Sequence, residues 1–357
     1  MIELLQTEHP VVQAPMAGIS TPALVAAVSN AGGLGSLGLG ASSVSQSRAA
    51  IVHTRTLTDK PFNVNVFCHR PPERDELVER AWIRHFSGLF EKFGVKAPRA
   101  LNEIYQSFLV DEQAFLMLLE LRPPIVSFHF GIPSFDRIAA LRTAGITTLA
   151  SVTSREEARI AEAAAIDGII AQGYEAGGHR SVFDPQGDDD QLSTFALVQR
   201  LVRDVDLPVI AAGGIMDGAG ISVALRHGAV AAQLGTAFIL CPESSAELAY
   251  KERLRASESC PTTMTSVISG RPARGFINDL ITHGEGPNSP LPASYPLAYD
   301  LAKQLHSAAA MRGNFEFSSY WAGKGAPYAR ELPAAELMQT LIRELRFASD
   351  LSIPSGR

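Results

Sequence analysis

The sequence predicts an α/β fold, a closed (β/α)8 TIM barrel, from one repeated unit. In each unit a short apolar run ends in a glycine-rich or polar turn, and an alanine-rich amphipathic stretch follows. Eight such alternations in a chain of 357 residues agree with one large barrel. A doubly wound open sheet shares this alternation and is the alternative architecture.

The expected strands are apolar runs bounded by glycine, proline or polar residues. They cover residues 11–16, 33–38, 62–67, 124–130, 147–152, 168–173, 208–214 and 229–235. Between them lie helix start signals. Thr21 precedes Pro22 at an expected first turn, and Ser154 precedes two glutamates in another.

Two segments do not fit the repeat. Residues 75–121 are too long for one connection and predict a helical insertion, two helices, before the fourth strand. Residues 256–332, after the eighth strand, are rich in glycine, proline and polar residues, which predicts loops. An insertion there lies at the top of a barrel, so we expect this segment to cover the active site. Residues 1–255 and 333–357 would form the barrel, within the same structural unit.

Charge and cysteine content exclude several classes of protein. The net charge of −6 argues against nucleic-acid binding. The three cysteines, Cys68, Cys241 and Cys260, are far apart and form no disulfide pattern, which favours a cytoplasmic location. The first ten residues lack the features of a signal peptide, and no apolar stretch is long enough for a membrane helix.

Function in a barrel is located at the carboxyl ends of the strands. Paired glycines, Gly213 and Gly214, end the seventh strand, and Gly235 and Thr236 end the eighth. Such positions often bind a phosphate through backbone N–H groups. A tight turn without a ligand is the alternative interpretation. There is no P-loop motif, and "GGLGSLG" precedes a strand instead of following one, unlike a dinucleotide fingerprint.

Three amides, Asn65, Gln172 and Gln233, are also expected at strand ends. Amides donate and accept hydrogen bonds and suit the edge of a planar ring such as isoalloxazine, although each could instead satisfy buried backbone. The stretch "AQGYEAGGHRS" adds His179, and His129 ends the fourth strand. These histidines belong to different strands, and no set of carboxylates completes a metal site, so we expect no metal.

The stretch "ASYPLAYDLAKQL" places two phenols and an ammonium at helical spacing. Tyr295, Tyr299 and Lys303 recur at i, i+4 and i+8, and Pro296 suits the start of a helix. This stripe could hold a small anion, or could pack on the barrel with its polar tips in solvent. Tyr105, from the earlier insertion, is a weaker candidate for the same pocket.

Seven stretches together resemble the nitronate monooxygenases, formerly called 2-nitropropane dioxygenases. They are "QAPMAGIS", "AGGLGSLG", "NVNVF", "SFHFGIP", "QGYEAGGHRS", "VIAAGGIMDG" and "AQLGTAF", in this order. The resemblance covers roughly residues 10–330, and "YPLAYDLAK" and "WAGKGAP" are similar to class I of that family. No single stretch is specific, but the ordered set is.

The resemblance implies an FMN-dependent enzyme that oxidises alkyl nitronates, such as propionate 3-nitronate, with O2 to a carbonyl compound and nitrite. It implies His179 and His129 as catalytic residues. The implied substrate pocket contains Tyr105, Tyr295, Tyr299 and Lys303. The expected cofactor site contains Pro15, Met16, Ala17, Gly18, Asn65, Gln172, Gly177, Gly178, Gly213, Gly214, Gln233, Gly235 and Thr236. Ala17 stands where some relatives have glycine.

Two other functions stay open on the sequence. One is an NAD(P)H-dependent quinone or enoyl-thioester reductase on the same flavin barrel. The other is a non-catalytic protein that binds flavin or phosphate. The expected partners are a small anionic substrate and O2, and the chain could be a monomer or a homodimer.

Overall fold

The computed structural model describes residues 2–350, and its centre is a ring of eight parallel strands. Around the ring the order is β1, β9, β8, β6, β5, β4, β3 and β2. The strands are β1 (Val11–Gln13), β2 (Gly35–Gly38), β3 (Phe62–Phe67), β4 (Ile125–His129), β5 (Thr147–Val152), β6 (Gly168–Gln172), β8 (Val209–Ala212) and β9 (Ala231–Leu234). All eight expected strands are confirmed, although several are shorter than the apolar runs.

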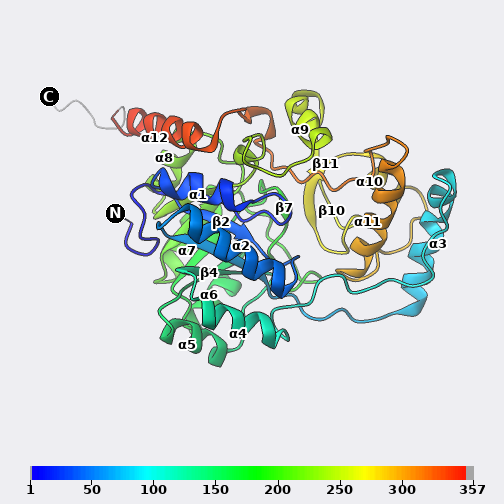
Figure 1. Ribbon diagram of the computed structural model, residues 1–357, viewed down its shortest axis with the longest axis horizontal. Helices are drawn as coiled ribbons and strands as arrows, with labels where there is room; N and C mark the ends of the chain where they lie inside the picture. Colours follow the sequence, from blue (N-terminus) through cyan, green and yellow to red (C-terminus); the bar gives the residue numbers. More distant parts are fainter. Residues whose placement is uncertain (1, 351–357) are drawn as a thin grey trace.

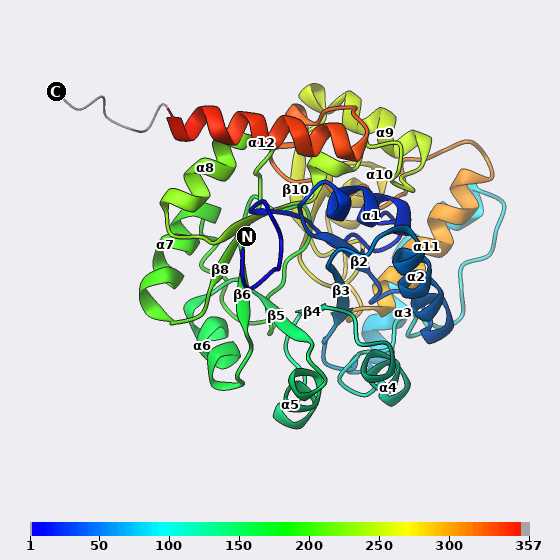
Figure 2. The same ribbon diagram turned by 60° about the vertical axis from the view of Figure 1, so that its left-hand side comes forward.

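The ring is closed between its first two strands. Val12 forms a parallel bridge with Leu34, just before β2, and the N–H of Gln13 donates to the carbonyl of Leu34. A doubly wound sheet would leave two free edges at this point, so the alternative architecture is wrong. Figure 2 shows the strands surrounded by helices.

Helices alternate with the strands and cover the outside of the ring. They are α1 (Pro22–Asn30), α2 (Val44–Leu57), α4 (Glu112–Leu121), α5 (Phe135–Thr143), α6 (Arg155–Ala163), α7 (Thr194–Asp204) and α8 (Gly218–Arg226), with α12 (Ala334–Asp350) at the end of the chain. The expected helix starts at Thr21 and Ser154 are confirmed: these residues are the N-caps of α1 and α6, and each hydroxyl accepts from the N–H three residues later. Figure 1 shows α12 beside α1 and α8.

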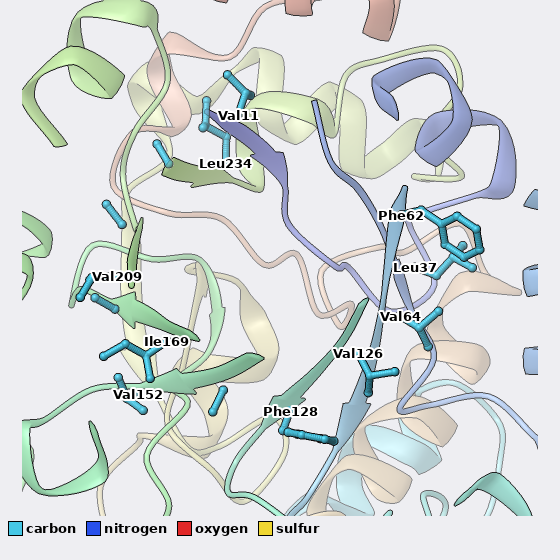
Figure 3. Packing of buried hydrophobic residues seen from close by; sticks show 14 of the residues in the cluster. Val11, Leu37, Phe62, Val64, Val126, Phe128, Val152, Ile169, Val209 and Leu234 are labelled. Carbon is cyan, nitrogen blue, oxygen red and sulfur yellow. The ribbon is translucent and has the colours of Figure 1, made fainter. Parts of the chain in front are cut away.

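Strand residues alternate between two hydrophobic layers. Val11, Val126, Ile169 and Val209 point toward the helices, in the cluster that Figure 3 shows around the ring. The residue next to each points into the barrel, where Val12, Ile125, Ile170 and Ile210 form a separate cluster. This period of two explains why the strands read as continuous apolar runs: both of their faces are buried.

A second part of the molecule lies at one end of the barrel, and we call it the cap (Figure 1). It combines both insertions: α3 (Glu76–Lys92) from the first packs on α11 (Leu297–Ala310) from the second. It also contains α9 (Leu248–Arg255), α10 (Asp279–Gly284) and a three-stranded antiparallel sheet. That sheet is formed by β10 (Thr262–Thr265), β11 (Ala273–Phe276) and β7 (Gly178–His179). The cap has its own hydrophobic core, centred on Trp82, Phe86 and Leu305.

Residues 256–332 contain more regular structure than their loop-rich composition suggests: besides the helix expected near Pro296, they form two strands and a second α-helix. One detail of the expected helix needs correction. Helix α11 begins at Leu297, so Tyr295 precedes it and does not belong to its stripe. Pro296 is the N-cap residue of α11, and the peptide bond between Tyr295 and Pro296 is cis. Within residues 2–350 no helix combines the length and apolar character needed to cross a bilayer.

Candidate active site

One cavity of about 680 Å³ lies between the carboxyl ends of the barrel strands and the cap. Every residue that the sequence singled out for cofactor, substrate or catalysis lines it. Two of them, Gly178 and His179, form β7 of the cap sheet. Four come from the insertions: Tyr105, Tyr295, Tyr299 and Lys303. The others lie at or after the ends of the barrel strands: Pro15, Met16, Ala17, Gly18, Asn65, His129, Gln172, Gly177, Gly213, Gly214, Gln233, Gly235 and Thr236. A cavity of this volume is large enough for a mononucleotide and a small second molecule.

The loops after β8 and β9 form a glycine cradle in one wall. Gly213 and Gly214 have positive φ angles of 131° and 68°, which favour glycine. The N–H groups of Gly214, Gly235 and Thr236 donate no hydrogen bond to any part of residues 2–350. Helix α8 is capped by its own Asp217, so these loop N–H groups are the donors left for an anionic ligand.

The three amides differ in how they are used. Gln172 donates to the carbonyl of His179 and accepts from the N–H of Ser181, so its amide holds the turn in place. Asn65 donates to Ser127. The Oε1 of Gln233, in contrast, is buried and has no hydrogen-bond partner in residues 2–350. A buried orphan acceptor requires a donor, and an N–H on the edge of a planar ring would supply one.

Gly177 has a structural role as well. A Cβ there would lie 2.5 Å from the backbone nitrogen of Gly323, so only glycine allows the "WAGKGAP" loop to approach. The N–H of Gly323 in turn donates to the hydroxyl of Thr236 over 3.0 Å. These contacts attach the loop to the glycine cradle.

His179 is held by a strand pair that the sequence did not indicate. It forms β7 with Gly178, and β11 pairs with it through Ala273. Its Nε2 lies 2.9 Å from the hydroxyl of Ser269. Burial is the main cause that lowers the pKa of His179 to about 3, and the nearby His129 and Arg271 contribute in the same direction. At neutral pH the imidazole is therefore uncharged.

His129 stands beside His179 and is also neutral. Its Nε2 lies 3.3 Å from the carbonyl of His179, and since a carbonyl only accepts, this nitrogen is the donor. Burial lowers the pKa of His129 to about 4. His69, which the sequence did not single out, lies near the same wall, 4.9 Å ring to ring from Tyr295. Burial and the charge of Arg271 lower its pKa to about 4 as well.

The opposite wall is built by the cap. The ammonium of Lys303 lies 5.0 Å from the ring centre of Tyr299 and 5.7 Å from that of Tyr105. Lys303 forms no ion pair within residues 2–350. Burial raises the pKa of Tyr105 and of Tyr295, so both phenols keep their protons and can donate. Three donors thus face one cavity without a carboxylate to satisfy them.

Two other strand-end residues have structural roles. The carboxylate of Glu175 accepts from the N–H and the hydroxyl of Thr194. Cys68 is buried, and burial raises the pKa of its thiol. In the described part of the chain, no three His, Cys, Asp or Glu side chains are grouped so that they could hold a metal ion.

Several lining residues were missed. Tyr250, on α9, and Trp321, which packs 5.1 Å from the ring of His179, both line the cavity. Gly323 and Gly325 line it from the "WAGKGAP" loop. The glycine spacing of that loop was a usable signal, whereas nothing in the short α9 distinguishes Tyr250 from a core tyrosine.

The barrel and its cavity define a class: a (β/α)8-barrel enzyme with one large ligand site at the carboxyl ends of its strands. The family model described as "Nitronate monooxygenase" matches residues 1–344. The chain therefore belongs to the nitronate monooxygenase family and is an oxidoreductase.

Individual relatives agree with this placement. A protein of Paraburkholderia phytofirmans named nitronate monooxygenase is 54% identical over 97% of this chain and 94% of its own. Among solved structures, nitroalkane oxidase from Streptomyces ansochromogenes is 38% identical with a TM-score of 0.88, covering 98% of this chain and 99% of that one. FabK from Thermotoga maritima is 30% identical with a TM-score of 0.74, covering 98% and 96%.

Proposed function

We propose that this chain is an FMN-dependent enzyme that oxidises alkyl nitronates with O2, giving a carbonyl compound and nitrite. Family membership supports nitronate oxidation. One observation supports the finer proposal: a single cavity has a glycine cradle on one wall and the unpaired ammonium of Lys303 on another. The first suits the phosphate of a mononucleotide, and the second suits a small anionic substrate.

The residues present fit FMN. The free N–H groups of Gly214, Gly235 and Thr236 would hold its phosphate, and the orphan Oε1 of Gln233 would accept from the edge of its ring. The flavin would supply the one-electron oxidation chemistry that protein side chains lack. The chain itself has to bind both molecules, orient them and exclude water.

The other walls would bind and orient the substrate. A nitronate carries its negative charge on the nitro oxygens, which Lys303 and the protonated phenols of Tyr105 and Tyr295 can meet as donors. His179 and His129 are neutral. Their lowered pKa values, of about 3 and 4, make them weak bases, and their contacts with Ser269 and with the carbonyl of His179 fix both rings, so we favour an orienting role over proton abstraction. A substrate that is already ionised needs no base, and propionate 3-nitronate meets this requirement.

A reductase that uses NAD(P)H on the same barrel is the second candidate. The sequence alone leaves this function open, because such a reductase would share the same barrel and flavin site. Anaerobic mixing separates the two. For a nitronate oxidase, the flavin spectrum of the purified protein changes with a nitronate and stays constant with NADH or NADPH. Rapid bleaching by a reduced nicotinamide, with no response to the nitronate, would reverse the assignment. A protein that responds to neither would be a non-catalytic binder.

A further inference from the structure

Arg271 is a buried arginine whose charge has no counter-ion. Its side chain is 3% exposed, and no carboxylate in residues 2–350 lies within ion-pair distance of it. One terminal nitrogen donates to the carbonyl of Val182, while Nε has no partner. Buried Arg180 shows the usual arrangement, with two contacts of 2.8 Å to Asp189. A buried charge without a counter-ion lowers the stability of the folded protein, which suggests that Arg271 has a functional role.

The position of Arg271 indicates what this role is. Its Cζ lies 4.3 Å from the ring centre of Phe130, on the far side of the cavity wall. The Phe130 ring lies 4.4 Å from His129, 5.6 Å from His179 and 5.4 Å from Tyr295. Arg271 does not line the cavity itself. It stands one aromatic layer behind the wall.

The acidic groups nearest to Arg271 are otherwise engaged. The carboxylate of Glu157 accepts from Thr153 and from the N–H of Phe183, and Asp184 accepts from the N–H of Gln186. Burial lowers the pKa of Arg271 to about 10, so it stays protonated at neutral pH. Its field therefore extends into the cavity through an apolar ring, where screening by water is weak.

We propose that Arg271 is a specificity-determining residue, whose fixed positive charge behind Phe130 raises the affinity of the cavity for anions over neutral molecules of the same shape. This inference rests on the proposed function, because a nitronate is an anion and its parent nitroalkane is neutral. Lys303 would contact the ligand directly from α11, and Arg271 would act through space from behind Phe130. Together they supply the positive charge that the neutral histidines do not.

Binding without turnover tests this proposal. Isothermal titration of the flavin-loaded protein uses nitrite as the anionic probe and nitroethane, in its neutral form, as the uncharged probe. Arg271→Met is the main variant, because an apolar side chain in place of a buried unpaired charge is often tolerated. Arg271→Gln is the second variant, and Arg271→Lys keeps the charge. Arg274→Gln is the matched control: Arg274 is equally buried on β11, and stacks on Tyr174 outside the cavity.

We expect nitrite to bind about tenfold more weakly to Arg271→Met and Arg271→Gln, which corresponds to about 1.4 kcal/mol. Arg271→Lys and Arg274→Gln should bind nitrite within about threefold of wild type, and nitroethane affinity should change less than twofold throughout. The proposal would be overturned if Arg271→Met or Arg271→Gln bound nitrite as tightly as wild type does. It would also be overturned if these variants lost affinity for nitrite and for nitroethane to the same extent. The two proposals can also fail separately. If the variants change nitrite binding as expected but the wild-type protein oxidises no nitronate, the role of Arg271 in anion binding stands and only the proposed function is refuted.

Discussion

The two sides of the cavity are built on different principles. The barrel side offers backbone N–H groups, glycines and amides, all of them uncharged and held by a closed ring of strands. The cap side offers phenols and the ammonium of Lys303, carried by helices and loops that pack on a separate core. On the proposed function, this contrast corresponds to a division of roles, in which the barrel would position the cofactor and the insertions would select the substrate.

The separate cores give this division a physical basis. The barrel is filled by its own strand residues, and the cap is filled mainly by side chains of α3, α10 and α11. A change in the cap core should therefore alter substrate binding and leave the barrel intact. Five predictions test this contrast.

The largest effect is expected for Lys303→Met. It removes the ammonium that lines the cavity and, on the proposed function, would meet the nitronate. The expected loss in kcat/KM is about 100-fold, which corresponds to losing one strong charge-assisted hydrogen bond. Flavin content should stay unchanged. Lys92→Met, which removes a similar aromatic-stacked lysine on α3 away from the cavity, is the control. If Lys303→Met and Lys92→Met lowered kcat/KM equally, the cap side of the cavity would have no special role in binding the substrate.

His179→Asn and His129→Asn should each lower kcat/KM with a nitronate by about 10- to 50-fold. Each variant loses a neutral side chain that would orient the substrate, and the expected loss corresponds to the free energy of one to two hydrogen bonds. His179→Asn should have the larger effect, since four aromatic side chains fix its ring and Ser269 holds its Nε2. Steady-state kinetics with a preformed nitronate provide the measurement. Full activity in both variants would contradict their assignment.

Gly235→Ala probes the barrel side alone. The φ of Gly235 is −106°, and an added Cβ would meet its nearest neighbour, Ala14, at 3.4 Å, so the fold should tolerate it. The same Cβ intrudes on the glycine cradle, and we expect flavin to bind about tenfold more weakly, as for a modestly overpacked site. Equilibrium dialysis against FMN measures this. Gly88→Ala, in open space on α3, should leave FMN binding unchanged.

Leu305→Ala probes the cap core alone. Leu305 is fully buried on α11, the helix that carries Tyr299 and Lys303. Its truncation should cost about 2–5 kcal/mol of local packing and raise KM for a nitronate several-fold. Flavin affinity should change less than twofold. Loss of flavin together with substrate affinity would show that the two cores are not separate, and Leu291→Ala at an exposed position is the control.

The smallest effect is expected from pH. Since His179 and His129 have pKa values of about 3 and 4, kcat/KM for a preformed nitronate should be flat from pH 6 to 8. Stability should behave differently. Below pH 6.5 the unfolded chain protonates these histidines and the folded chain does not, so the free energy of unfolding falls as pH drops toward 4. A sigmoidal rise or fall in kcat/KM around pH 6.5 would show that a histidine titrates during catalysis.

The same contrast explains what the sequence could predict. Barrel strands have both faces buried, so each reads as an apolar run, and the topology then places every strand end at one site. The cap has no such period. Strand β7 is two residues long and pairs with β11 almost a hundred positions later, and no local pattern records such a pairing. Arg271 lies in "SGRPARGF", which resembles an ordinary loop, because burial without a counter-ion is visible only in three dimensions.

Oxygen uptake tests the central claim most directly. The flavin-loaded protein is given preformed ethyl nitronate, and separately neutral nitroethane before it ionises, with nitrite measured in the same samples. We predict rapid O2 consumption and matching nitrite release with the nitronate, and at least a tenfold slower reaction with the neutral form. Equal rates with both forms would contradict an anion-selective cavity, and no oxygen uptake with any nitronate would contradict the proposed function itself.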